Sequence, residues 1–108
     1  MKKNNLLFEV TLDTGALIID FNDIAENITG YKKEEVLHKN WFEIFIDEKN
    51  ILDILDAFDK TLQSGPSSFQ HTNQIKTKDN KYITIKWDNK VTTDKYGIPI
   101  IQSKGEVI

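Results

Sequence analysis

Hydrophobic and polar residues alternate along the second half of the chain, over residues 67–91. From Tyr82 onward the odd positions carry the apolar side chains Ile83, Ile85, Trp87 and Val91, and the even positions 84–90 are polar. A period of two with one apolar face predicts a half-buried antiparallel strand. The polar residues 78–80 precede this strand and suit a turn, so the pattern predicts one long β-hairpin that other elements must cover.

Two polar side chains, His71 and Asn73, interrupt the apolar face of the first arm of this hairpin. They either face a cavity and orient a small ligand, or have their hydrogen bonds satisfied by backbone and water. Binding pockets combine apolar walls with a few placed polar groups, whereas most buried polar groups simply have partners. The sequence leaves both readings open.

The first half of the chain is predicted to form a second hairpin followed by short helices. Residues 6–12 and 16–21 read as two short strands around a turn that contains glycine. Asn22 and Asp23 can cap a helix that follows, and Asp23 and Glu26 have the spacing of a capping box. Gly30 marks the end of that helix. Residues 33–38 resemble a helical turn, and residues 40–46 an aromatic-rich connector.

The clearest helix is predicted to begin near residue 47. Its apolar residues recur at helical spacing; they are Ile51, Leu52, Ile54, Leu55, Phe58 and Leu62. Asp53, Asp56 and Asp59 are interpreted as a solvated face rather than a metal site. Gly65 and Pro66 are expected to end the helix. After the long hairpin, a turn at residues 94–97 leads to a last strand over residues 98–108. Strand runs separated by helices indicate an α+β fold with an antiparallel sheet.

Composition narrows the class of protein. The chain has 108 residues, 39% of them hydrophobic and 29% charged, which fits a single globular domain. A net charge of −3 argues against nucleic-acid binding, and no apolar run is long enough to span a membrane. Glu9 interrupts the apolar start, which argues against a signal peptide. The absence of cysteine excludes disulfides and thiolate chemistry, and we expect a cytoplasmic location.

Several motifs, in order along the chain, resemble those of the PAS (sensory-box) family, and the resemblance covers nearly the whole chain. Residues 13–22 look like the first hairpin of the family, with the Asn that opens the first helix. Residues 28–37 are similar to its hydrophobic-x-Gly-Tyr-x-x-Glu-Glu-Leu signature, and residues 39–45 resemble Lys-Asn-Trp-Phe-Asp-Leu-Phe. Residues 77–80 match Thr-Lys-Asp-Gly, with Asn in place of Gly. Trp87 and Asn89 stand where one subgroup has Trp and Asn.

The resemblance implies a PAS fold, in which short helices pack on one face of a five-stranded antiparallel sheet and enclose a small cavity. It implies one domain over residues 6–108, after an N-terminal margin at residues 1–5. Such a domain is a non-catalytic sensory or regulatory module. It would relay a signal to an output domain of a longer bacterial protein, such as a histidine kinase or a diguanylate cyclase. We also expect a homodimer. Val107 departs from the family, because an Asp that helps couple the sheet to a following helix usually stands there.

The resemblance places the candidate ligand-binding residues on the helices and on the covered sheet face. They are Phe21, Ile28, Trp41, Phe42, Phe58, His71, Asn73, Ile85, Trp87 and Asn89. The aromatic residues among them also suit a plain core, which would make the domain a ligand-free module for protein interaction or dimerisation. A small enzyme is a third reading, although His38 and His71 are the only imidazoles available as general bases.

The resemblance also bears on cofactors, of which none is identified. Heme-binding members carry a His on the long helix, and residues 47–65 contain none, so this form of heme binding is disfavoured. Photoreceptors that form a cysteinyl–flavin adduct are excluded by the lack of cysteine. Non-covalent flavin stays open, with Trp87 stacking and Asn73 or Asn89 bonding the ring edge. No metal site is expected, because Asp20 and Asp23 are interpreted as helix-capping residues.

Overall fold

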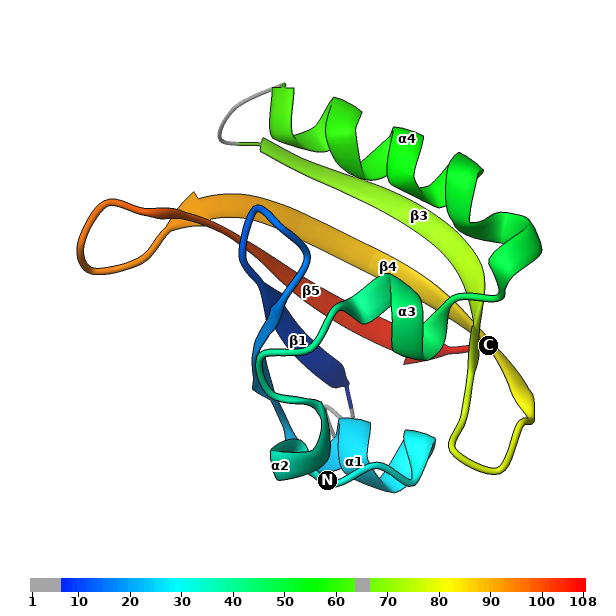
Figure 1. Cartoon of the computed structure of the whole chain (residues 1–108). Helices are drawn as coiled ribbons and strands as arrows, with labels where there is room; N and C mark the ends of the chain where they lie inside the picture. The colour runs from blue at the N-terminus through cyan, green and yellow to red at the C-terminus, as the bar shows by residue number, and fades with distance from the viewer. Residues whose placement is uncertain (1–6, 64–66) are drawn as a thin grey trace, which may run out of the picture.

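A computed structural model describes residues 7–63 and 67–108 (Figure 1). The expectations for residues 1–5, for Leu6 as a strand residue, and for Gly65 and Pro66 as a helix end lie outside the described residues. The helices are α1 (Asp23–Thr29), α2 (Lys33–Val36), α3 (Trp41–Phe45) and α4 (Ile51–Gln63), with a 3₁₀ turn at Glu48–Asn50 before α4. The strands are β1 (Phe8–Leu12), β2 (Ile18–Phe21), β3 (Ser67–Lys76), β4 (Tyr82–Thr93) and β5 (Pro99–Val107).

The strands form one antiparallel sheet in the order β2-β1-β5-β4-β3. The last strand along the chain is therefore the central one, and it joins the first hairpin to the second. In this register Ser103 of β5 lies opposite Val10 on one side and opposite Asn89 on the other. The prediction of an α+β fold with a five-stranded antiparallel sheet is confirmed.

The helices cover one face of the sheet, with α4 running along β3 and α3 lying over the sheet (Figure 1). On β4 the side chains of Ile85 and Trp87 are buried on that face, while Lys86 and Asp88 are exposed on the other. The predicted alternation of the hairpin is therefore confirmed. None of the helices in the described ranges is long and apolar enough to cross a membrane.

The second strand begins later than predicted, at Ile18 rather than at residue 16. Ala16 has a φ of 65° and its N–H donates to the Asp13 carbonyl, so it belongs to the turn. The Asp13 carboxylate accepts from the backbone N–H groups of Gly15 and Leu17 at 2.9 Å and fixes this turn. The Asp13 side chain thus holds residues 15–17 in the turn, and β2 begins only after them.

Asn22 alone caps α1, so the predicted capping box between Asp23 and Glu26 is wrong. The Asn22 Oδ1 accepts from the Ala25 N–H at 2.9 Å and from the Glu9 N–H of β1 at 3.0 Å. Asp23 is consequently the first helical residue, and Glu26 accepts from the Lys33 N–H instead of reaching back to the cap. The predicted helix end is confirmed, because Gly30 has a φ of 83°.

Two further elements and one helix face differ from the prediction. The expected connector at residues 40–46 is the helix α3, because the Asn40 side chain accepts from the N–H groups of Phe42 and Glu43 and caps it. The turn expected over residues 33–38 ends at Val36, and His38 has a φ of 67°. Leu52 does not belong to the buried face of α4, since its side chain is 82% exposed. The prediction that Asp53, Asp56 and Asp59 are solvated is confirmed.

Candidate functional site

A cavity of about 60 Å³, partly open to the surface, lies between the covered face of the sheet and the helices α3 and α4. Its walls are mainly aliphatic and aromatic, with four polar side chains on the sheet. The lining residues are Val10, Leu12, Trp41, Phe42, Ile54, Phe58, His71, Asn73, Trp87, Asn89, Ile101 and Ser103. Its volume is below the roughly 300–1,000 Å³ of pockets that bury a drug-sized ligand. A larger ligand would therefore extend through the open side.

The polar side chains of the cavity come from three neighbouring strands. Asn89 of β4 pairs with Ser103 of β5, and His71 of β3 pairs with Trp87 of β4. Because directly opposed and diagonal residues on one sheet face are within reach of each other, these groups form a continuous polar strip. Asn73 follows His71 on the same face of β3.

One hydrogen bond inside the cavity joins two lining residues. The indole Nε1–H of Trp87 donates to the Oδ1 of Asn73 at 2.8 Å. An indole N–H is a donor only, so it must face the oxygen of the amide and not the nitrogen. The bond therefore fixes the orientation of the Asn73 amide, with its Oδ1 toward Trp87.

The other polar groups of the cavity have no hydrogen-bond partner within the described part of the chain. This holds for the ring of His71, the amide of Asn89, the hydroxyl of Ser103 and the Nδ2 of Asn73. Among the residues that the structure describes, no lysine, aspartate or glutamate lines the cavity. The cavity therefore presents neutral polar groups to its contents, on an otherwise apolar wall.

Most of the predicted ligand-binding residues line this cavity. Those that do are Trp41, Phe42, Phe58, His71, Asn73, Trp87 and Asn89. Phe21, Ile28 and Ile85 do not, because packing partners cover them. Phe21 stacks on Phe45 with ring centroids 5.9 Å apart, Ile85 is fully buried, and Ile28 packs against the core.

Five lining residues are absent from the predicted set: Val10, Leu12, Ile54, Ile101 and Ser103. Three of them lie on the apolar faces that periodicity indicates for β1 and α4. Ile101 and Ser103 reach the cavity because β5 inserts between β1 and β4. Alternation along β5 would have placed Ser103 on a buried face, but only the strand order places it beside Asn89.

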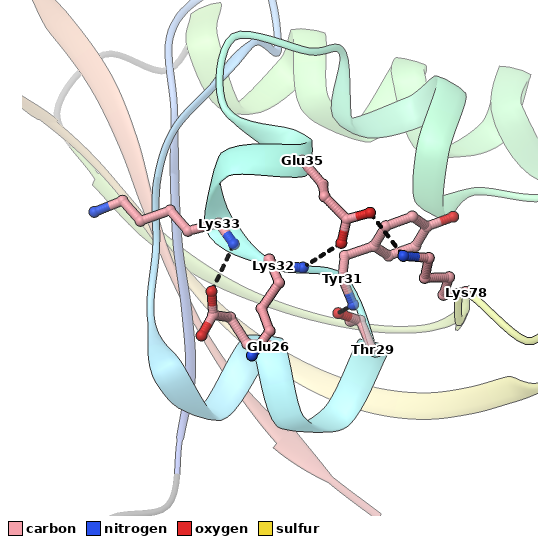
Figure 2. A network of polar contacts seen from close by, with 7 residues as sticks. All are labelled: Glu26, Thr29, Tyr31, Lys32, Lys33, Glu35 and Lys78. Carbon is pink, nitrogen blue, oxygen red and sulfur yellow. Dashed lines mark hydrogen bonds and ion pairs between the residues drawn. The ribbon is translucent and has the colours of Figure 1, made fainter.

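No residue of the sequence signatures at 28–37 and 77–80 lines the cavity. Figure 2 shows that residues of these signatures instead contact one another. The Lys78 Nζ lies 2.6 Å from the Glu35 Oε2, and the Lys78 N–H donates to the Thr29 carbonyl at 2.8 Å. The Lys78 ammonium also lies 5.6 Å from the ring centroid of Tyr31. These contacts fasten the turn between β3 and β4 to the helices α1 and α2.

Glu35 has a pKa below its ordinary value. The first cause is the backbone N–H of Lys32, which donates to its Oε1 at 2.7 Å, and the second is the hydrogen bond from Lys78. Both partners stabilise the ionised carboxylate. The carboxylate is exposed, so the effect concerns the fastening of the β3–β4 turn and not the chemistry of the cavity.

The predicted capping role of Asp20 is wrong, because this residue pairs with a lysine instead. The Asp20 Oδ1 lies 2.9 Å from the Lys33 Nζ, and this hydrogen bond lowers the pKa of the Asp20 carboxyl. Within the described residues, no group of three or more acidic or histidine side chains is arranged to hold a metal ion.

The sequence matches the PAS domain family over residues 5–107. No curated protein sequence matches the chain. Among solved structures, the fold is similar to the PAS domain of the RpfR quorum-sensing receptor from Cronobacter turicensis in complex with C12:0. The TM-score is 0.82 at 25% identity, over 100% of this chain and 98% of that one.

Two more distant structures share the fold. One is the PAS-B domain of Drosophila melanogaster Cycle with bound ethylene glycol, with a TM-score of 0.81 and 17% identity over 94% of this chain and 99% of that one. The other is a PAS domain from a two-component sensor histidine kinase, with a TM-score of 0.75 and 14% identity over 95% and 86% of the two chains. Because the family match spans nearly all residues and the fold agrees with it, this chain belongs to the PAS domain family.

Proposed function

We propose that this PAS domain is a sensory module that binds a small amphipathic molecule in the cavity between the sheet and α4. The observation that carries the proposal is the strip of polar side chains on the cavity wall. His71, Asn89 and Ser103 have no partner among the described residues, although the surrounding wall is apolar. His71 and Asn89 are half-buried and face the partly open cavity, so water or a polar ligand group would take up their free hydrogen-bonding capacity.

The similar structures support the binding of a small molecule. The RpfR domain was solved with C12:0 and with BDSF, and the Cycle domain with ethylene glycol. The wall of this cavity has an apolar part at Leu12, Ile54 and Phe58 and a polar part on β3, β4 and β5. That division suits a molecule with an apolar chain and one polar end.

The relay would pass through the sheet to an output domain in a longer protein. β5 carries Ser103 into the cavity and is also the last strand of the domain. A ligand shifts an equilibrium only through a difference in its affinity for two states. We therefore propose two positions of β5 relative to its neighbours, read by an output domain such as a histidine kinase or a diguanylate cyclase. We also propose that the protein forms a homodimer and is located in the cytoplasm.

A ligand-free interaction module is the second candidate function. The observation in its favour is the aromatic filling of the interior. The rings of Phe42 and Phe58 meet edge to face at 5.4 Å, and those of Trp41 and Trp87 at 5.6 Å, which leaves a cavity of only about 60 Å³. In this reading ordered water satisfies the polar strip, and the domain acts by pairing with other proteins.

Mass spectrometry of small molecules released by denaturing the purified protein separates the two candidates. The sensory function predicts a stoichiometric organic molecule, or stabilisation of the empty protein by a member of an amphiphile panel. The Asn73→Leu substitution should remove that binding while the domain stays folded. Gln74→Leu is the matched control, since Gln74 is the next residue and is exposed. No released molecule and no stabilisation by any panel member would favour the interaction module.

A further inference from the structure

We propose that the cavity selects ligands whose polar end accepts hydrogen bonds, such as a carboxylate, over ligands whose polar end only donates them. This inference rests on the proposed function, because it specifies the chemical class of the molecule that the cavity holds. It follows from one hydrogen bond and from the side chains around it.

The Trp87–Asn73 hydrogen bond makes Asn73 a donor toward the cavity. The Trp87 indole donates to the Oδ1 at 2.8 Å, so this oxygen is engaged and the two N–H groups on the Nδ2 remain. The indole itself is held in place, because it is 4% exposed and meets the rings of Phe8 and Trp41 edge to face at 5.1 and 5.6 Å. A flipped Asn73 amide would place its Nδ2 donor against the Nε1–H donor of Trp87, so the flip is unfavourable.

The remaining polar lining can turn donors toward the same point. The hydroxyl of Ser103, the amide of Asn89 and the ring of His71 can each donate as well as accept a hydrogen bond, and no carboxylate lines the cavity among the residues that the structure describes. A carboxylate has two oxygens that together accept about four hydrogen bonds. An ammonium group accepts none, so it cannot use the two Nδ2 donors of Asn73. The polar wall of the cavity therefore complements a ligand group that accepts hydrogen bonds, such as a carboxylate.

The test compares two probes of equal chain length, C12:0 and the twelve-carbon primary amine, in calorimetric titrations of the full chain at one pH and ionic strength. The wild-type protein should bind the acid at least about tenfold more tightly, since one hydrogen bond to a charged group is worth this much. Asn73→Asp keeps the size of the side chain and still accepts from Trp87, but it no longer donates. It should weaken acid binding about 10- to 100-fold and leave amine binding unchanged or tighter.

Gln74→Glu is the matched control, because it adds the same negative charge one residue away, at an exposed position. It should change both affinities by less than about twofold, because exposed charges are screened. Ser103→Ala is a second test variant that removes one donor with little change in volume. It should weaken acid binding about tenfold with the amine unaffected, even if Asn73→Asp does not fold.

Equal wild-type affinity for the acid and the amine would overturn the inference while leaving the sensory function intact. Equal weakening of both probes by Asn73→Asp and Ser103→Ala would also overturn it, because those losses would be structural. An effect of Gln74→Glu as large as that of Asn73→Asp would assign the selectivity to net charge. Failure of both probes to bind the wild-type protein, together with no molecule released on denaturation, would overturn the proposed function and the inference with it.

Discussion

The ring of Trp87 lies directly against the backbone of Gly105, its partner across β4 and β5. A Cβ at residue 105 would lie 2.7 Å from the Cζ3 of Trp87 and 2.6 Å from the Cγ2 of Ile85. Both neighbours are buried and packed on other sides, so neither can move away freely. The absence of a side chain at residue 105 therefore sets the position of the indole that bonds Asn73.

The first prediction concerns this contact. Gly105→Ala should destabilise the domain by about 1–3 kcal/mol, because an extra methyl group overpacks the core beside Trp87. Chemical unfolding measures the loss, and the fluorescence of the folded state should also change, since an indole is displaced. Gly15→Ala is the control, because the nearest atom to its Cβ would be the Asp13 Oδ1 at an ordinary 3.5 Å. Equal stabilities of the two variants would contradict the account.

The second prediction concerns the cap of α1. Asn22→Ala removes a side chain that bonds the N–H groups of Ala25 and Glu9 and donates to the Leu7 carbonyl. We expect a loss of about 2 kcal/mol in the free energy of unfolding, from the cap and the contacts to the first strand. Asn27→Ala, at an exposed position of the same helix, should change stability by less than about 0.5 kcal/mol. Similar losses in both variants would remove Asn22 from this role.

The third prediction concerns the buried face of α4. Leu52→Ala should alter the free energy of unfolding by less than about 0.5 kcal/mol, because that side chain is 82% exposed. Leu55→Ala should destabilise the domain by about 2 kcal/mol, because Leu55 packs against the core. Thermal unfolding of the two variants compares the positions directly. A larger effect at residue 52 would mean that the helix presents a different face to the sheet.

The fourth prediction is a pH dependence at Glu35. Its pKa in the folded protein lies below the ordinary 4.5, through the Lys32 N–H and Lys78. The unfolded chain therefore binds the proton more readily, and the stabilisation is complete above pH 4.5 and is lost as the pH falls through the folded pKa. The difference in Tm between the wild-type protein and Glu35→Gln should be largest near pH 7 and disappear in acid.

Glu34→Gln serves as the control for that titration, because Glu34 is exposed and has no hydrogen bond to its side chain within the described part of the chain. Its effect on Tm should be small at every pH. A Glu35→Gln difference that persists unchanged at acid pH would show that the carboxylate does not hold the β3–β4 turn.

The sequence predicts those features that depend on local patterns. Alternation along β4 identifies Trp87 and Asn89 as residues of the covered face, and both line the cavity. Gly30 and Asn22 mark the two ends of α1, because their chemistry suits the positions that they occupy. The family resemblance adds the expectation of a cavity at this face.

Features that depend on contacts between distant segments were not predicted. Ser103 joins the cavity only because β5 inserts between β1 and β4, and no local pattern fixes that order. Likewise the Trp87–Asn73 bond depends on the register of the hairpin, in which Asn73 lies opposite Ile85 and diagonal to Trp87. Helical spacing alone puts Leu52 on the apolar face, because it does not say which residue ends that face.

The most direct test of the central claim, that a small molecule binds at Asn73 inside this domain, is an NMR titration of the ¹⁵N-labelled protein. The chain has only two tryptophans, so the indole N–H signal of Trp87 can be assigned by one substitution at Trp41. Adding C12:0 should shift the Trp87 indole and the side-chain amides of Asn73 and Asn89 together and to saturation. The backbone amides of the exposed Lys86 and Asp88 should change little. Unchanged indole and side-chain amide signals with C12:0 and with a panel of amphipathic acids, alcohols and amides would contradict the claim.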